Sequence, residues 1–320
     1  MGKLSRLAGL LAFSASLAAT SLAANAGVMM MTGQPFHGHP ITSVKYIGNG
    51  WWNDNGTVYH TPHYMMTRSQ AMRTHPAAGA LSYHGGPVLT VPKIYVVLWG
   101  YKSAGDPDKV GVLLKHYLKV FGGSGIANVV TQYYQGSGGS QTFITNDKPQ
   151  LAGIWKDNTN PIPAHPTDAQ VATEAGLLMA HFGFSANASY SVATAHNHSI
   201  SGFGTQYCAY HGSTNQGGHT ISYTNLPYQP DAGSNCGANI ISPPSDETGT
   251  DEGISIVQGH EYAESTTDPQ LNAWWDSGNG EEIGDLCAWT NIQNDPMGAG
   301  SYTMQPEYSD ATSSCVHSYP

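Results

Sequence analysis

The residues best suited to chemistry form the run His260-Glu261-Tyr262-Ala263-Glu264. Residues four apart share one face of a helix, so His260 and Glu264 can converge on one point while Glu261 projects beside them. Zinc peptidases build half of a metal site in this way, and the glutamate after the first histidine acts as general base on a metal-bound water. Here a glutamate replaces the second histidine of that motif. A carboxylate is a permitted zinc ligand, but it also suits calcium or manganese.

A catalytic metal needs at least three protein ligands and one open position. The run E-E-I-G-D at 281–285 resembles the downstream E-x-x-x-D of thermolysin-like peptidases, in which the glutamate binds the metal and the aspartate orients a histidine ligand. We therefore predict His260, Glu264 and Glu282 as metal ligands and Asp285 as the residue behind them.

Other residues compete for the same roles. Glu281 is an alternative third ligand, and Asp268 lies one helical turn beyond Glu264. His211 and His219 are reserve ligands, although a structural role in a loop is the stronger expectation for each of them.

The alternative for the motif is a solvated acidic helix face with a lone capping histidine. Gly259 permits a close backbone approach beside His260, and the acids that follow favour a metal site. The chain has no G-x-S-x-G elbow, no P-loop and no strand-linked G-x-G-x-x-G. A glycosidase that pairs Glu261 with Glu282 would suit the many Trp and Tyr residues, but no spacing favours it.

The motif requires a helix, and the pattern predicts one that starts after Asp251 and stops before Asp268-Pro269. Other elements must hold that helix. We expect a buried strand at 93–99, a helix opened by Asp106-Pro107 and running to 121, and a helix at 167–182 with a capping box. Short strands follow, at 189–195, 206–210 and 219–224.

This order of elements predicts an α+β fold. Sheet, edge strand over a cleft, metal helix and lower lobe is also the order in which zincin peptidases assemble. We expect a zincin-like mixed sheet with packed helices, an active-site helix and a small irregular C-terminal lobe at 270–320.

Three segments are expected along the chain. Residues 1–26 combine Lys3 and Arg6, an apolar run and a small-residue end, which is typical of a signal peptide. Residues 27–80 show no sustained periodicity and are expected to form an irregular arm or propeptide. Residues 81–320 are expected to form one metallopeptidase-like domain, and no stretch is long and apolar enough to span a membrane.

Composition limits the partners. The formal net charge is −10, and loss of Lys3 and Arg6 with a signal peptide would make it two units more negative. Nucleic acid and anionic lipid are therefore disfavoured, because both require basic patches. The expected partner is a peptide or a cell-wall substrate.

Four cysteines in an exported chain favour two disulfides. They are Cys208, Cys236, Cys287 and Cys315. Three pairings remain open, of which Cys208–Cys236 and Cys287–Cys315 are both local. In the loop-entropy model each local pair would stabilise the fold by roughly 3–4 kcal/mol.

Several short stretches resemble the phosphate-induced, EXORDIUM-like family of secreted proteins. They are YHGGPVLT at 83–90, IYVVLWG at 94–100, YCAYHG at 207–212 and the motif region that ends at 287. Plant members are similar to cell-wall or apoplastic proteins associated with growth. Microbial relatives resemble this chain in carrying H-E-x-x-E followed by T-D-P and E-I-G-D, which implies a metallopeptidase-like core.

These observations together predict a secreted metal-dependent hydrolase, a peptidase with Glu261 as general base and zinc as its cofactor, with calcium and manganese as open alternatives. The competing hypothesis is a non-catalytic extracellular or cell-wall binding module that holds a structural metal or none.

Overall fold

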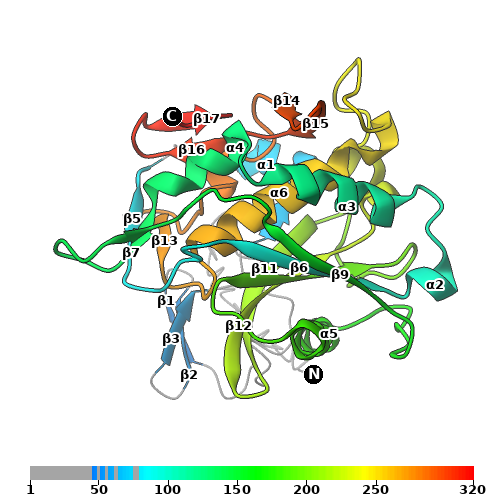
Figure 1. Ribbon diagram of the computed structural model, residues 1–320, viewed down its shortest axis with the longest axis horizontal. Coiled ribbons are helices and arrows are strands. Elements are labelled where there is room, and N and C mark those ends of the chain that lie inside the picture. Colours follow the sequence, from blue (N-terminus) through cyan, green and yellow to red (C-terminus); the bar gives the residue numbers. More distant parts are fainter. Residues whose placement is uncertain (1–44, 49–50, 55–56, 61–63, 75–78) are drawn as a thin grey trace, which may run out of the picture.

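The computed structural model describes residues 45–48, 51–54, 57–60, 64–74 and 79–320 (Figure 1). The expected signal peptide lies outside these ranges. The described part contains no helix that is both long and apolar enough to cross a membrane.

A six-stranded mixed sheet forms the centre of the fold, with strand order β4-β11-β12-β10-β6-β9. Strands β9, β6, β10 and β12 are parallel, whereas β11 is antiparallel to both β12 and β4. The strands are β4 (Tyr64–Met66), β6 (Lys93–Trp99), β9 (Leu151–Asp157), β10 (Ala188–Thr194), β11 (Tyr207–Gln216) and β12 (His219–Leu226). The predicted mixed sheet is thus present, and β4 adds an edge strand from the range expected to be an arm.

Helices cover both faces of this sheet (Figure 1). Because successive side chains of a strand point to opposite faces, β6 contributes to two cores. Val96 and Leu98 pack into the core that includes residues of α3 and α6, whereas Val97 and Trp99 pack into the core beneath α5. The long helices are α3 (Val110–Phe121), α5 (Asp168–Phe182) and α6 (Glu252–Thr267), and the short ones are α1 (Arg68–Thr74), α2 (Tyr101–Ala104) and α4 (Gly125–Asn128).

The predicted helix ends are partly right. Thr167 and Gln170 form the expected capping box of α5. Helix α3 starts at Val110 rather than directly after Asp106-Pro107, because the Asp106 carboxylate reaches forward and accepts hydrogen bonds from the amides of Val110 and Gly111. The aspartate therefore still satisfies open amide groups of the first turn, from further upstream than predicted.

Helix α6 is buried over its whole length. It packs against β11 and β12 on the sheet side and against β15 on the other. Small residues permit these close contacts: a Cβ on Gly253 would lie 1.9 Å from the Cys236 carbonyl oxygen, and one on Gly259 would lie 2.3 Å from the Met304 methyl group. The run from His260 to Glu264 therefore lies in the interior of the molecule.

Small antiparallel sheets form the remaining structure, including the C-terminal lobe. The pairs are β13 (Trp274–Asp276) with β5 (Leu81–Tyr83), β14 (Gln293–Met297) with β15 (Gly300–Met304), β16 (Glu307–Ser309) with β17 (Ser314–Val316), and β7 (Tyr134–Gln135) with β8 (Thr142–Phe143). Strands β1 (Lys45–Gly48), β2 (Trp51–Asp54) and β3 (Thr57–His60) form a separate sheet. The 3₁₀ segments are Val129–Gln132, Gln229–Cys236, Gly249–Asp251 and Asp285–Cys287.

Both disulfides join the local cysteine pairs, Cys208–Cys236 and Cys287–Cys315. The first bond ties the start of β11 to the segment that leads to α6. The second ties the 3₁₀ turn at Asp285–Cys287 to β17. Each bond thus fixes a segment that carries acidic or histidine side chains towards α6.

Candidate metal centre

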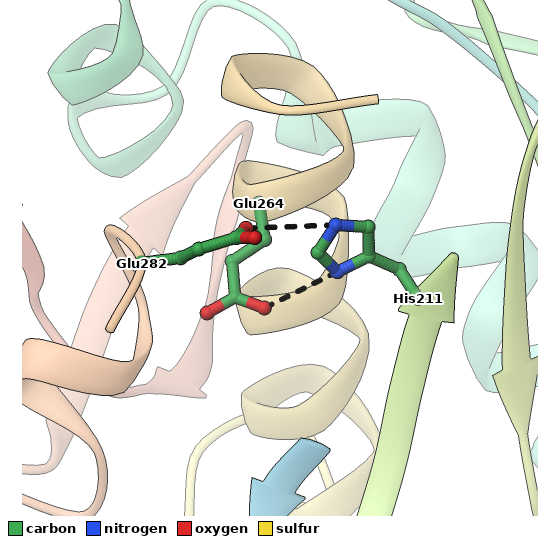
Figure 2. A group of neighbouring side chains, drawn as sticks. All are labelled: His211, Glu264 and Glu282. Atoms are coloured by element: carbon green, nitrogen blue, oxygen red, sulfur yellow. Dashed lines mark ion pairs between the residues drawn. The ribbon is translucent and has the colours of Figure 1, made fainter. Parts of the chain in front are cut away.

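Three elements bring histidine and carboxylate side chains together. Figure 2 shows His211 on β11, Glu264 on α6 and Glu282 on the segment after β13, all pointing towards one another. One ligand atom from each of these three residues lies within 4.8 Å of the other two, and all three side chains are fully buried.

The His211 ring lies between two carboxylates. Its Nδ1 atom is 3.3 Å from Glu264 Oε2, and its Nε2 atom is 3.5 Å from Glu282 Oε2. Glu261 also approaches, with Oε2 at 3.6 Å from His211 Nδ1. This cluster therefore offers one imidazole and three carboxylates.

A second group lies on the other side of the same glutamate. Glu264 Oε1 is 3.1 Å from His260 Nε2, and Asp285 Oδ1 is 3.6 Å from that same nitrogen. Ligand atoms of His260, Glu264 and Asp285 also lie within 4.8 Å of one another. Glu264 is common to both groups, and its Oε1 accepts a hydrogen bond from the Asp285 amide.

Hydrogen bonds hold the two rings from behind. His211 Nε2 lies 3.3 Å from the Asp268 carbonyl oxygen, which can only accept, so this contact helps to orient the ring. His260 Nδ1 lies 3.0 Å from Gln305 Nε2, which also donates to the Gly284 carbonyl oxygen. The ring atoms that face Glu264, Nδ1 of His211 and Nε2 of His260, have no hydrogen-bond partner.

Burial and mutual charge shift the protonation of the cluster. Burial alone would lower the pKa of His211, but the Glu261 and Glu264 carboxylates outweigh it and raise that pKa to about 10. Burial raises the pKa of Glu261 to about 7 although both imidazoles oppose the shift. Burial also favours protonated Glu264, yet the His260 and His211 rings prevail and hold its pKa well below the usual range. Glu264 is thus the carboxylate that stays ionised most readily.

The donor set fits a divalent cation. Glu261 and Glu264 are fully buried, and neither Glu261 oxygen nor Glu264 Oε2 has a hydrogen-bond partner. Buried carboxylates of this kind are costly unless they are paired or coordinate a metal. Mixed imidazole and carboxylate donors suit zinc or manganese, and the high carboxylate content also suits calcium.

The structure redistributes the predicted ligands. His260, Glu264 and Glu282 were predicted as one set, but the structure groups Glu282 with His211 and groups His260 with Asp285. Glu264 belongs to both groups. Asp285, predicted behind the ligands, faces the same His260 nitrogen as Glu264.

The competing residues take different places. Asp268 is fully buried, and its Oδ1 accepts hydrogen bonds from the amides of Asn272 and Ala273, where the chain leaves α6. Glu281 is 7% exposed, and burial and the nearby Asp285 raise its pKa well above the usual value. His211, a reserve ligand, lies in the cluster, whereas His219 stacks on Phe184 at the exposed start of β12.

The sequence pattern does not identify two residues that lie near the cluster. Gln305 contacts the His260 ring, and Glu307 is a buried carboxylate whose oxygens have no hydrogen-bond partner. Burial raises the pKa of Glu307 well above its usual value, while His260 acts in the opposite direction. Both follow β15, about 45 residues after His260 in sequence, and no motif spacing links them to it.

Comparison with known proteins gives one distant relative. The chain is 26% identical over 246 residues to Protein EXORDIUM-like 5 from Arabidopsis thaliana, a match that covers 65% of this chain and 63% of the relative. No family model matches the chain, and no solved structure matches it. This distant homology supports the resemblance to the phosphate-induced, EXORDIUM-like family.

Proposed function

We propose that this chain is an exported metal-dependent hydrolase that cleaves peptide bonds. His211, Glu264 and Glu282 hold the cation, and Glu261 is the general base. The observation that carries this proposal is the position of Glu261. It lies on the ligand helix with one oxygen 3.6 Å from His211 Nδ1, and neither of its oxygens is engaged in a hydrogen bond.

In the proposed reaction Glu261 transfers protons, and the Asp268 carbonyl oxygen orients a ligand. A bound divalent cation would polarise the substrate carbonyl and make water a better nucleophile. The Glu261 carboxylate takes a proton from the attacking water as the new C–O bond forms, and returns it to the leaving amine nitrogen as the C–N bond breaks. The Asp268 carbonyl oxygen, 3.3 Å from Nε2, helps to hold the His211 ring between the Glu264 and Glu282 carboxylates.

The order of elements supports a zincin-like arrangement. The parallel strands β6, β9 and β10 are followed by the antiparallel strand β11, the parallel strand β12, the motif helix α6 and then small C-terminal sheets. In zincin peptidases a sheet likewise precedes the metal helix and a small lobe follows it. The EXORDIUM-like resemblance and the two disulfides support export.

Burial favours a second candidate function. His211, Glu261, Glu264 and Glu282 are fully buried, whereas a catalytic metal must offer an open position to water and substrate. Peptide cleavage thus requires the protein segments that bury these side chains to move and admit substrate. If these segments stay in place, the same residues form a closed structural metal site in an extracellular binding module.

Two variants of the full chain separate these functions. Glu261→Gln removes the base but no proposed ligand, so it should retain the metal and lose peptide cleavage by about 10²–10⁴-fold. Glu252→Gln is the matched control, because Glu252 is a buried glutamate of the same helix whose Oε2 accepts from the Ile240 amide. It should retain both metal and activity.

Metal content by mass spectrometry and cleavage of a quenched fluorescent peptide library are the measurements. A wild-type chain without stoichiometric metal, or a Glu261→Gln variant that cleaves at the wild-type rate, would overturn the proposal. A metal-loaded chain that cleaves no peptide and loses thermal stability with its metal would support the structural site instead.

A further inference from the structure

The Glu264 carboxylate lies between two imidazoles, and each imidazole faces a different oxygen. Oε1 is 3.1 Å from His260 Nε2, and Oε2 is 3.3 Å from His211 Nδ1. A single metal ion would need only one of these oxygens and one ring. The second ring and the second oxygen therefore require a separate explanation.

The His260 ring faces two carboxylates in the interior of the protein. Although His260 Nε2 is within 3.1 Å of Glu264 Oε1, it is not in hydrogen-bonding geometry with any atom, and the ring is fully buried. A second carboxylate, Asp285, approaches the same nitrogen at 3.6 Å. A buried imidazole nitrogen beside two carboxylates offers one nitrogen and two oxygen donors, a set that suits a divalent cation.

We propose that the chain binds a second divalent cation, held by His260, Asp285 and Glu264 Oε1, next to the cation held by His211, Glu282 and Glu264 Oε2. Glu264 then bridges the two ions. The inference concerns ion binding and rests on the proposed function only for the first ion. Carboxylate bridges of this kind occur in two-metal hydrolases, where both ions act on one substrate.

Binding of the second ion requires the side-chain amide of Gln305 to change its orientation. As it stands, its Nε2 group donates to His260 Nδ1, which places the ring proton on Nε2, the atom needed by the ion. Rotation of the amide by half a turn presents Oε1 to a proton on Nδ1 and frees Nε2 as a ligand. The rotation breaks the bond from Gln305 Nε2 to the Gly284 carbonyl oxygen and would bring two acceptor oxygens together, so the side chain must also shift away from that carbonyl.

Ion counting on the full-length chain tests the inference. The metal-free protein is titrated with zinc chloride, and separately with manganese chloride, by calorimetry. We expect two ions per chain for the wild type and one for Asp285→Asn, which keeps the size of the side chain but weakens the second site. Glu282→Gln should also leave one ion, and Glu264→Gln should weaken both sites by at least tenfold.

Glu252→Gln is the matched control, because Glu252 is a buried glutamate of α6 whose Oε2 accepts from the Ile240 amide and which belongs to neither ligand set. It should still bind two ions. A wild type that binds one ion, or an Asp285→Asn variant that still binds two, would overturn the second site. These outcomes are separate from the proposed function, which fails on peptide cleavage and on Glu261→Gln.

A measurement on the wild type alone covers the case in which the variants do not fold. Two manganese ions bridged by one carboxylate give an exchange-coupled electron paramagnetic resonance spectrum. A single ion gives the hyperfine pattern of isolated manganese. An uncoupled spectrum at saturating manganese would contradict the bridged pair.

Discussion

Glu247 gives a pH dependence of stability that can be worked out from its surroundings. The side chain is 4% exposed and lies beside the start of α6, where Oε2 accepts hydrogen bonds from the Ser255 hydroxyl at 2.7 Å and the Thr303 amide at 3.0 Å. Burial raises the pKa of Glu247 from 4.5 to about 8, although these hydrogen bonds oppose the shift. At neutral pH this carboxyl group is therefore protonated in the folded chain and ionised in the unfolded chain.

The direction of this pH dependence follows from proton linkage. Between the unfolded pKa and the folded pKa the native state binds more protons, so the free energy of unfolding falls as pH rises. The stabilising contribution is fully present below pH 4.5 and is lost progressively up to about pH 8. At about 1.4 kcal/mol per pH unit, the loss by pH 7 is roughly 3 kcal/mol.

Glu247→Gln should remove this dependence, because the amide does not titrate and its oxygen can still accept from Ser255 and Thr303. Relative to the wild type, the variant should gain roughly 3 kcal/mol between pH 4.5 and pH 7. Urea unfolding at a series of pH values, with the chelator concentration held constant, measures this gain. Glu174→Gln is the comparison. Burial raises the pKa of Glu174 to about 7, so the loss of stability that this residue causes should be complete at a lower pH than for Glu247. A variant whose stability relative to the wild type did not change with pH would refute the reasoning.

Three further outcomes are expected. Replacing Cys208 and Cys236 by Ala should lower the free energy of unfolding by roughly 3.5 kcal/mol, because the bond joins residues 28 apart, and urea unfolding under oxidising conditions measures it. Gly284→Ala should reduce bound metal while retaining the fold, since the new Cβ would lie 2.6 Å from His260 Nδ1 and displace the ring; metal analysis together with near-ultraviolet circular dichroism tests this. Chelation should lower the melting temperature, by the equivalent of about 2.7 kcal/mol where free ion was at 100 times Kd, and a melting temperature indifferent to chelator would argue against any bound ion.

The sequence predicted the features that depend on local physics. The motif helix, the capping box at Thr167 and the buried strand at 93–99 follow from helix periodicity, capping and β-branched content over a few residues. The convergence of His260 and Glu264 is equally local, because four residues separate them on α6. These elements all appear in the fold at or near their predicted bounds.

The sequence did not predict features that depend on which distant elements become neighbours. His211 meets Glu264 because β11 packs against α6, and no motif in the sequence between them indicates that contact. Strand β9 was missed because Leu151–Asp157 has a single β-branched residue and a mostly half-exposed pattern; its parallel pairing with β6 makes it a strand. The placement of Glu282 beside His211 and of Asp285 beside His260 depends on the backbone path at 281–285, which spacing alone does not specify.

Glu264 stands where the zinc peptidase motif has its second histidine, and the structure suggests a physical reason for this difference. A histidine at position 264 would present one ligand nitrogen, because the other carries a proton or a second-shell hydrogen bond. A glutamate presents two oxygens, and here they point to different imidazoles, at 3.1 Å from His260 Nε2 and 3.3 Å from His211 Nδ1. A carboxylate can serve both groups at once, whereas a neutral imidazole cannot. The glutamate that weakened the resemblance to a one-metal site is therefore the residue type that a shared, two-sided site requires.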